Sequence, residues 1–463
     1  MRKRVAVIGG GIAGLAAAVR LRDLTPAGTE IIVYEQSGVL GGKLRTGELA
    51  GVAVERGAES FLTSGPDGGE SAAVSLAKRL GLGGALVHPA AVPAALAIDG
   101  RLVAVPGGTL IGVPGDLSTL GPVARPAPDR DRDAGRPLLA AGQDVTVGAL
   151  VRDRYGDEVV DRLVDPMLGG VYAGRADRLS LEVTMPQLAD AARTEHTLSG
   201  AVRAAQAANR RPSGRPIFTA VDGGMTRLVA AAAAAGGARI SLGLPVRDLA
   251  RAAQGWRLLL GPHSVAQTEI LDAVVFAVPA KPAARLLAGV AADAAEAVAG
   301  LDYASVALAA LALPPGTPLP ELSGFLVPPG EGTLVKAVTF VSRKWPHLAA
   351  AGGPVIVRAS LGRAGEEQRL QFDDAVLLER ARAELGDLIG GALPPPVAAW
   401  VQRWGGSLPQ YAPGHRDRIA AARAALPPGL ALAGAAFDGV GIPACVASGE
   451  RAAEDVSKTL EDA

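Results

Sequence analysis

Three glycines near the N-terminus stand at a spacing that suits the binding of a phosphate group. Gly9, Gly11 and Gly14 follow the apolar run 5–8 and precede an Ala- and Leu-rich stretch at 12–24. Glycines placed between a strand and a helix permit a tight turn and a close approach of the backbone to an anion, and the helix N-terminus offers free N–H groups. The candidate contacts are Gly9, Gly10, Gly11, Ile12, Ala13 and Gly14. The pattern alone is weak in a chain with 60 glycines.

A carboxylate further along the chain supports a dinucleotide as the ligand. The run 31–34 is typical of a second buried strand, and Glu35 closes this strand about 20 residues after the last glycine. A carboxylate there accepts hydrogen bonds from a ribose diol and repels a 2′-phosphate. Glu35 and its neighbour Gln36 are therefore predicted to lie beside the adenosine ribose, although a strand-end acid in water gives the same pattern. The order strand, helix, strand indicates a βαβ unit.

The same alternation of strands and helices returns in the middle and at the end of the chain. The pattern predicts helices at 225–235 and 449–460 and strands at 240–244, 256–260, 271–278 and 430–434. Between these parts, 147–163 and 181–209 have helical patterns, and 122–137 is expected to be an exposed loop.

We therefore predict an α/β fold in which a discontinuous Rossmann-type domain is interleaved with an α+β substrate domain that contains a helical insertion. The expected segments are 1–86, 218–283 and 396–463 for the cofactor domain, 87–217 for the helical insertion and 284–395 for the rest of the substrate domain.

Composition narrows the function classes. Lys and Arg number 46, as do Asp and Glu, so the formal net charge is zero, which argues against nucleic acid as the main partner. The single cysteine, Cys445, excludes an intramolecular disulfide and a thiolate zinc site, which fits a cytoplasmic protein. No metal site is expected. No apolar run predicts a membrane-spanning helix, although amphipathic segments between 147 and 210 leave a peripheral membrane contact open.

Segments outside the first loop resemble the flavoprotein superfamily of amine oxidases, phytoene desaturases and protoporphyrinogen oxidases. The segment 40–46 resembles its doublet-glycine segment, 57–60 stands where its flavin-contacting turn lies, and 439–453 resembles the loop and helix that close its flavin site. By this resemblance the dinucleotide is FAD. The contacts that it implies are Gly42, Lys43, Gly57, Ala58, Glu59, Ser60, Val440, Gly441 and Ile442, with Val246 on an adenine-side strand and Trp404 near the flavin ring.

Central segments resemble one branch of this superfamily. The segment 166–181, with Gly-Gly-Val-Tyr-Ala-Gly at 169–174, is similar to a signature of bacterial protoporphyrinogen/coproporphyrinogen oxidases, as are 112–117, 222–228 and 403–411. The Gram-positive type fits best. The resemblance implies oxidation of the porphyrinogen substrate coproporphyrinogen III to coproporphyrin III in haem biosynthesis, by three two-electron steps that use O2 and release H2O2. It also implies handover of the product to a downstream haem-pathway enzyme.

The resemblance also implies where the substrate lies. Gly169, Gly170 and Val171 would line the cavity over the flavin, where a bulky side chain would block a tetrapyrrole. Relatives often carry a basic residue for a substrate propionate after the Gly57 turn, but 61–66 has none. The remaining candidates for this charge are Arg175, Arg178 and Arg343. No acid or base is assigned, because aromatisation drives the reaction and the protein mainly positions the ring and the flavin.

Three other functions stay open. A protoporphyrinogen IX oxidase would act on a substrate with vinyl in place of propionate at two positions. A flavin amine oxidase usually has an aromatic cage, whereas aromatic residues make up only 3% of this chain. A binding protein of the GDP-dissociation-inhibitor-like fold would lack flavin, but Glu35, the Gly41-Gly42 pair and the C-terminal loop argue against it. We expect Cys445 to be a small core residue rather than a covalent tether for flavin.

Overall fold

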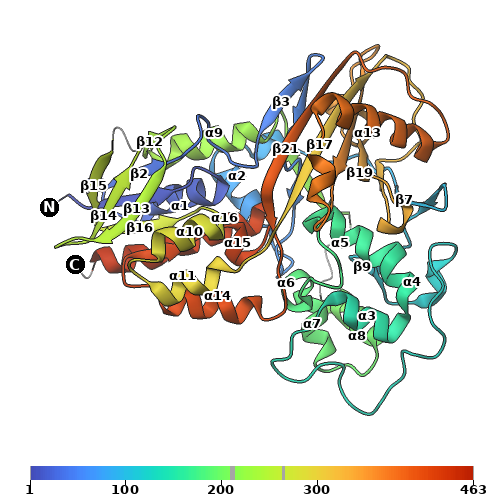
Figure 1. Ribbon diagram of the computed structural model, residues 1–463, viewed down its shortest axis with the longest axis horizontal. Coiled ribbons are helices and arrows are strands. Elements are labelled where there is room, and N and C mark those ends of the chain that lie inside the picture. The colour runs from blue at the N-terminus through green and yellow to red at the C-terminus, as the bar shows by residue number, and fades with distance from the viewer. Residues whose placement is uncertain (1, 209–213, 263–265, 462–463) are drawn as a thin grey trace.

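The computed structural model describes residues 2–208, 214–262 and 266–461, and one of its two main parts is built on a five-stranded parallel sheet (Figure 1). The strand order is β12-β2-β1-β16-β22, and every neighbouring pair is parallel. The strands are β1 (Arg4–Ile8), β2 (Glu30–Tyr34), β12 (Arg239–Ser241), β16 (Ala273–Phe276) and β22 (Leu430–Leu432). Because they come from distant parts of the chain, the predicted discontinuous Rossmann-type α/β fold is confirmed.

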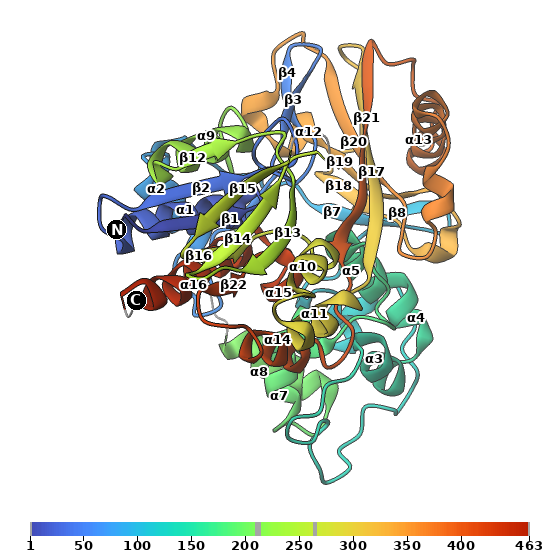
Figure 2. The ribbon, with the colours of Figure 1, turned by 60° about the vertical axis from the view of Figure 1, so that its left-hand side comes forward.

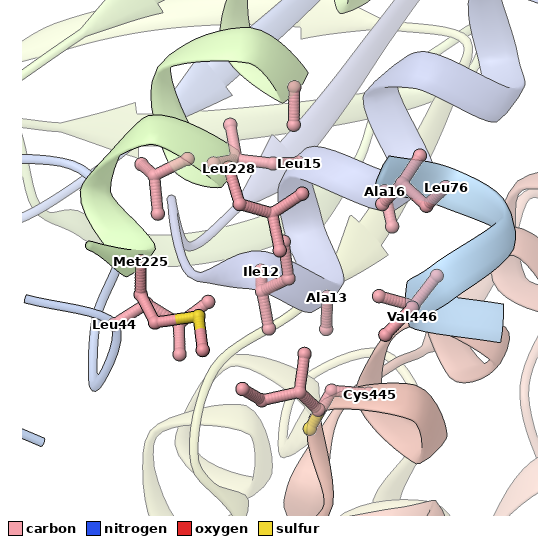
Figure 3. Packing of buried hydrophobic residues seen from close by; sticks show 14 of the residues in the cluster. Ile12, Ala13, Leu15, Ala16, Leu44, Leu76, Met225, Leu228, Cys445 and Val446 are labelled. Atoms are coloured by element: carbon pink, nitrogen blue, oxygen red, sulfur yellow. The ribbon is translucent and has the colours of Figure 1, made fainter. Parts of the chain in front are cut away.

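Helices cover both faces of this sheet, because its strands alternate their buried side chains between two cores. Val5 and Val7 face a core that includes α1, α2, α9 and α16, part of which is drawn in Figure 3, whereas Ala6 and Ile8 face a core that includes α10, α11 and α14. The helices are α1 (Ile12–Leu24), α2 (Ala72–Arg79), α9 (Met225–Gly236), α10 (Ala280–Leu287), α11 (Ala292–Ala299), α14 (His415–Ala424) and α16 (Ile442–Glu461).

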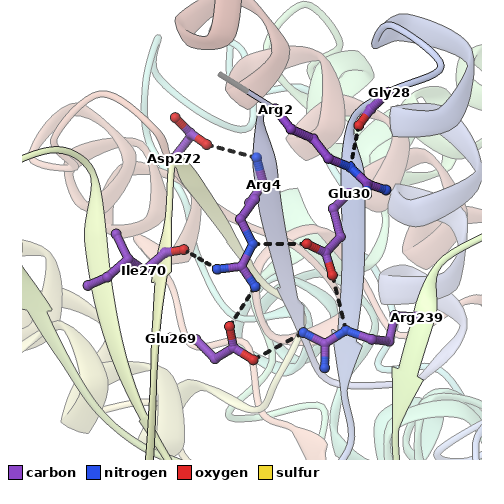
Figure 4. Close-up of polar contacts among 8 residues, drawn as sticks. All are labelled: Arg2, Arg4, Gly28, Glu30, Arg239, Glu269, Ile270 and Asp272. Atoms are coloured by element: carbon purple, nitrogen blue, oxygen red, sulfur yellow. Dashed lines mark hydrogen bonds and ion pairs between the residues drawn. The ribbon is translucent and has the colours of Figure 1, made fainter.

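A ring of four charged residues ties a smaller antiparallel sheet to the parallel sheet (Figure 4). Arg4 and Arg239 each contact both Glu30 and Glu269, at 2.5–3.2 Å. The hydrogen bond from Arg4 is the main cause that lowers the pKa of Glu30. The smaller sheet consists of β13 (Val246–Arg251), β14 (Trp256–Leu260) and β15 (Gln267–Leu271).

The second main part is a seven-stranded sheet with the order β21-β17-β20-β19-β18-β7-β8. The helix α13 (Asp374–Ile389) packs on one face of it through Leu377, Ala381 and Leu385 (Figure 1). The strands are β7 (Ala94–Ile98), β8 (Arg101–Ala104), β17 (Tyr303–Leu313), β18 (Gly324–Leu326), β19 (Val335–Phe340), β20 (Val355–Leu361) and β21 (Ala398–Pro409). This sheet meets the first part along β17 and β21 (Figure 2).

The helical stretches predicted at 147–163 and 181–209 are interrupted. Gly156 has a φ of 89° and follows the end of α3 (Val147–Tyr155), and the chain continues through α4 (Asp157–Val159) and a π-helical turn into α5 (Asp165–Tyr172). Pro186 starts a new helix because it lacks the N–H that α6 would need to continue. The three helices of the second stretch are α6 (Leu181–Thr184), α7 (Pro186–Ala192) and α8 (Leu198–Ala208), and residue 209 lies outside the described residues.

Other predicted boundaries also differ. The strand predicted at 271–278 is divided, because Asp272 exchanges two hydrogen bonds with Arg4 where the chain passes from β15 to β16. The strand predicted at 240–244 ends at Ser241, and α16 begins at Ile442 rather than at Gly449. Within the described ranges, no helix is both long and apolar enough to cross a membrane.

The crossing of α1 and α16 yields a test of packing. A Cβ on Gly449 would stand closer than 3.0 Å to the carbonyl oxygen of Ala13. We expect Gly449→Ala to lower the free energy of unfolding by about 1–3 kcal/mol through overpacking. Gly289→Ala is the control, because its Cβ would meet no atom within 4 Å. Urea denaturation measures both, and equal stabilities of the two variants would contradict this account of the crossing.

Candidate cofactor and substrate site

The loop between β1 and α1 has the backbone geometry of an anion cradle. Gly9 has a φ of 106°, and a Cβ there would stand closer than 3.0 Å to the carbonyl oxygen of Ala277. A Cβ on Gly14 would stand equally close to the carbonyl oxygen of Gly9. A Cβ on Gly11, by contrast, would meet no atom within 4 Å. The space beside Gly11, at the N-terminus of α1, is where a pyrophosphate fits.

The second glycine pair lies directly against this loop. The N–H of Gly41 donates to the carbonyl of Gly10 at 2.8 Å, and Gly41 forms a β-bridge with Gly11. Gly42 has a φ of 58°, and a Cβ there would lie 3.4 Å from the Cα of Gly11. Two glycine backbones therefore bound one open space. Lys43 follows, and burial lowers the pKa of its ammonium group.

Glu35 lies at the end of β2, and its carboxylate also fixes the phosphate loop. One oxygen accepts the N–H of Gly10 and the other accepts the N–H of Ser37, both at 2.8 Å. Each oxygen keeps a lone pair that a ribose hydroxyl can use. Gln36 is exposed beside it. Val246 begins β13 and is buried, and the chain just before it hydrogen-bonds to the carbonyl of Glu35.

A buried ion triad holds the turn at 57–60. Glu59 pairs through one oxygen with Lys344 and through the other with Arg358. Arg358 also donates to the backbone carbonyl oxygens of Glu55 and Gly57, at 3.0 and 3.1 Å. Burial acts to raise the pKa of Glu59, but the two cations outweigh it and hold this pKa at about 2. Both carboxylate oxygens are engaged, so the backbone of the turn is the part left to face a cofactor.

Trp404 lies against the same turn. Its indole N–H donates to the carbonyl of Arg56 at 2.6 Å, and its ring is 3.5 Å from the place of a Cβ on Gly57. The guanidinium of Arg45 stands 5.9 Å from the ring centroid. The indole is only half-buried, so part of it is free to contact a ligand. Ala58 and Ser60, the remaining predicted residues of the turn, are also half-buried.

The loop after β22 leads into α16 and meets the start of α1. Ile442 is buried in the same core as Ile12 and Ala13. Ahead of it in the chain, Val440 is half-buried and Gly441 is exposed. Cys445 lies in this core too, below the start of α1 in Figure 3, and burial raises the pKa of its thiol to about 11. A thiol of this kind is protonated and unreactive at neutral pH.

The end of α5 connects the large sheet to the cofactor loops. The ring of Tyr172 meets that of Tyr411 edge to face, with centroids 5.9 Å apart. Gln410 donates to the carbonyl of Tyr172 at 2.9 Å, and the hydroxyl of Tyr411 donates to the carbonyl of Ala435 at 2.5 Å. One chain of contacts thus joins the segment 169–174 to the loop after β22.

The predicted substrate residues are spread around the end of α5. A Cβ on Gly170 would lie 3.2 Å from Leu326, Gly169 is half-buried, and Val171 is 48% exposed. The three candidate arginines do not converge, because each pairs with a different acid. These pairs are Arg175 with Asp165, Arg178 with Asp302 and Arg343 with Glu321.

Four cations near the site escaped prediction from the sequence, namely Lys336, Lys344, Arg358 and Arg363. Lys336 and Arg363 are buried beside the end of α5. The signal for Lys336 was present, since it interrupts a strand of otherwise mostly apolar residues at 334–340. The partners of Lys344 and Arg358 are remote in sequence, so no local pattern indicates them.

The Glu59 triad predicts a specific response to acid. The pKa of Glu59 is lower in the folded protein than the ordinary value of 4.5, so the triad stabilises the fold fully above that pH and loses this effect as the pH falls toward 2. We expect Glu59→Gln to lower the free energy of unfolding at pH 7 by about 3–5 kcal/mol, because it leaves buried cations unpaired.

Calorimetry from pH 7 to 2 measures this effect. The difference between Glu59→Gln and wild type should shrink below pH 4.5. Glu379→Gln is the control, because it removes a pair with Arg382 at the surface, where screening by water leaves the pair little effect on stability. A difference that stays constant down to pH 2 would argue against the triad.

Known proteins match this chain over almost its whole length. The profile of the flavin containing amine oxidoreductases matches residues 12–457. The coproporphyrinogen III oxidase of Mycobacterium tuberculosis is 38% identical over 460 residues, which cover 98% of this chain and 97% of that protein. The protein of the same name from Bacillus subtilis is 31% identical and covers 98% of both chains.

A solved structure from Exiguobacterium sp. 255-15, described as a candidate protoporphyrinogen oxidase, is similar with a TM-score of 0.84 and 29% identity, and covers 100% of this chain and 99% of that one. The two glycine segments around Gly11 provide the open cradle that a flavin dinucleotide requires. This chain therefore belongs to the flavin containing amine oxidoreductase family and binds FAD.

Proposed function

We propose that this chain oxidises coproporphyrinogen III to coproporphyrin III with O2 as the electron acceptor. The observation that carries the proposal is the full-length similarity to proteins named coproporphyrinogen III oxidase. The position of the segment 169–174 supports it, because this segment contacts the large sheet and is linked through Tyr411 to the loop after β22. Conversion of a porphyrinogen to a porphyrin removes six electrons and six protons, so three O2 are consumed and three H2O2 are released.

The residues of this chain divide into those that hold the cofactor and those that place the substrate. Gly11 and Gly42 would hold the pyrophosphate and Glu35 the ribose, while the backbone at 57–60 and the N-terminus of α16 would face the ring. Bound FAD supplies a two-electron acceptor that can be reoxidised by O2. The positive end of the α16 dipole favours negative charge near it.

The end of α5 would place one face of the porphyrinogen against the cofactor. The small residues Gly169 and Gly170 leave room for a flat ring, and the exposed Val171 offers an apolar contact. Aromatisation of the product drives the reaction, so correct placement is the main contribution of the protein. We assign no acid or base.

The proposal includes the domain boundaries and the setting of the enzyme. We propose that 1–86, 218–283 and 396–463 form most of the FAD domain and that 87–217 and 284–395 form most of the substrate domain. The five strands of the parallel sheet lie in the first three segments, which supports this division. Two elements cross the proposed boundaries, because β21 belongs to the seven-stranded sheet and α11 packs on the core of the parallel sheet. The single cysteine supports a cytoplasmic location. The apolar side chains of α3 and α8 are buried in the helical core, which accounts for their amphipathic pattern without a membrane. The product would pass to the next enzyme that uses a porphyrin.

Anaerobic mixing tests the proposed reaction. Coproporphyrinogen III should bleach the flavin absorption, and admission of O2 should restore it and yield three H2O2 per coproporphyrin formed. The same measurement with protoporphyrinogen IX gives the substrate preference, which we expect to favour coproporphyrinogen by at least about tenfold, because a lost charge-assisted hydrogen bond has this effect. A flavin spectrum that coproporphyrinogen leaves unchanged would exclude this function.

Two glycine variants separate cofactor binding from folding. Gly11→Val puts a side chain into the open cradle, where its Cβ would meet no atom within 4 Å, so we expect the FAD affinity to fall at least about tenfold while the stability of the apoprotein changes by less than about 1 kcal/mol. Gly14→Ala places a carbon against the carbonyl of Gly9, so its apoprotein should be destabilised by about 1–3 kcal/mol. Flavin content after gel filtration and apoprotein melting distinguish them. Full FAD occupancy in Gly11→Val would show that the pyrophosphate lies elsewhere.

A further inference from the structure

A small cavity lies at the C-terminal end of α5, outside the cofactor loops. It has a volume of about 10 Å³, about the space of one water molecule, and Asp165, Gly169, Gly174, Arg175, Lys336 and Arg363 line it. The cavity therefore has room for one oxygen atom of a carboxylate rather than for a tetrapyrrole ring, and Gly169 connects it to the segment proposed to face the substrate.

Two buried cations in this cavity bind backbone carbonyls instead of acids. Lys336 is 6% exposed and donates to the carbonyl of Gly169 at 3.0 Å, which uses one of its three N–H groups. Arg363 is 5% exposed and donates to the carbonyls of Thr333 and Val327 at 2.9 and 3.0 Å. Among the residues that the structure describes, neither cation forms an ion pair with a carboxylate.

The one acid that lines the cavity is already engaged. The carboxylate of Asp165 accepts the N–H of Ala176 at 2.6 Å and pairs with Arg175 at 3.2 Å. Glu366, which also acts electrostatically on Arg363, pairs with Arg369 at 2.9 Å. Lys336 and Arg363 therefore leave an excess of positive charge in a buried place.

An excess of buried charge is costly unless a counter-ion compensates it. The cost is visible at Lys336, where burial and the nearby Arg363 lower the pKa of the ammonium group to about 7. Burial lowers the pKa of Arg363 as well. A carboxylate that entered the cavity would accept the unused N–H groups of Lys336 and remove the repulsion between the two cations.

We propose that Lys336 and Arg363 bind a carboxylate of the substrate, namely a propionate at a position where protoporphyrinogen carries a vinyl group. The inference rests on the proposed function and extends it to the choice between the two porphyrinogens. Gly169 lines the cavity and belongs to the segment at the end of α5, so the carboxylate of a carboxyethyl arm would fill the cavity while the ring stays against that segment. A vinyl group in the same place leaves the two cations without a counter-ion, which disfavours protoporphyrinogen.

Steady-state kinetics of Lys336→Gln with both substrates test this site. Glutamine removes the charge and keeps an N–H donor on a side chain that is one atom shorter. We expect kcat/KM for coproporphyrinogen III to fall about tenfold to hundredfold, mainly through KM, because a hydrogen bond to a charged group is lost. The rate with protoporphyrinogen IX should stay within about twofold of the wild-type rate, so the preference for coproporphyrinogen III is lost. Lys336→Arg should restore most of it.

Controls separate this outcome from a general loss of function. Lys281→Gln removes an exposed lysine of α10 and should leave both rates unchanged. Flavin content and melting temperature show whether each variant folds. If Lys336→Gln folds poorly, binding of coproporphyrin III, a tetracarboxylate, is measured directly through the quenching of its fluorescence by wild type and by Lys336→Arg. If wild type bound coproporphyrin III no more tightly than protoporphyrin IX, this result would overturn the carboxylate site.

The failure of this site and the failure of the proposed function give different results. Equal losses on both substrates in Lys336→Gln, or an unchanged preference for coproporphyrinogen, overturn the carboxylate site while the oxidase function stands. Wild-type protein that oxidises neither porphyrinogen overturns the function, and the site with it.

Discussion

The start of α1 is packed backbone against backbone, and the cofactor site is built around this packing. Gly9 lies against Ala277, Gly14 against Gly9, and Gly449 against Ala13, each without room for a side-chain carbon. Packed interiors tolerate little added volume, so these contacts fix β1, α1, β16 and α16 relative to one another. Space is left only at Gly11, where N–H groups at the helix N-terminus are available to an anion. The cradle is therefore rigid because glycines allow these backbone segments to pack in direct contact.

The phosphate loop depends on residues that are close together in the chain, which explains how much of the site could be predicted from the sequence. Glycine spacing and short apolar runs identify β1, α1, β2 and the place of Glu35, because each depends on neighbours in the chain. The partners of Glu59 are 285 and 299 residues away, and no periodicity indicates such a pair. The helix breaks at Gly156 and Pro186 show a second limit of prediction from the sequence. The apolar pattern continues through both positions, but the helix does not.

Two groups of charged side chains inside the protein differ in their counter-ions. Around Glu59, two cations meet one carboxylate that accepts from both, and Arg358 places its remaining donors on backbone carbonyls. Around Lys336, two cations meet only carbonyls, and the nearby acid is paired elsewhere. The first group contains its own carboxylate and holds two parts of the fold together. Among the residues that the structure describes, the second group has no carboxylate partner, which is the expected condition of a site that a charged ligand completes.

Two polar links, together with apolar contacts of β17 and β20, position the large sheet relative to the cofactor site. On one side Glu59 joins the turn at 57–60 to Arg358 of β20. On the other side Tyr411, just beyond β21, joins Tyr172 of α5 to Ala435 in the loop after β22. A shift of about 1 Å between reacting groups can cost a hundredfold in rate. These two links join the large sheet to the turn at 57–60 and the end of α5 to the loop after β22, so the side chains that form them contribute to the alignment on which the proposed oxidation depends.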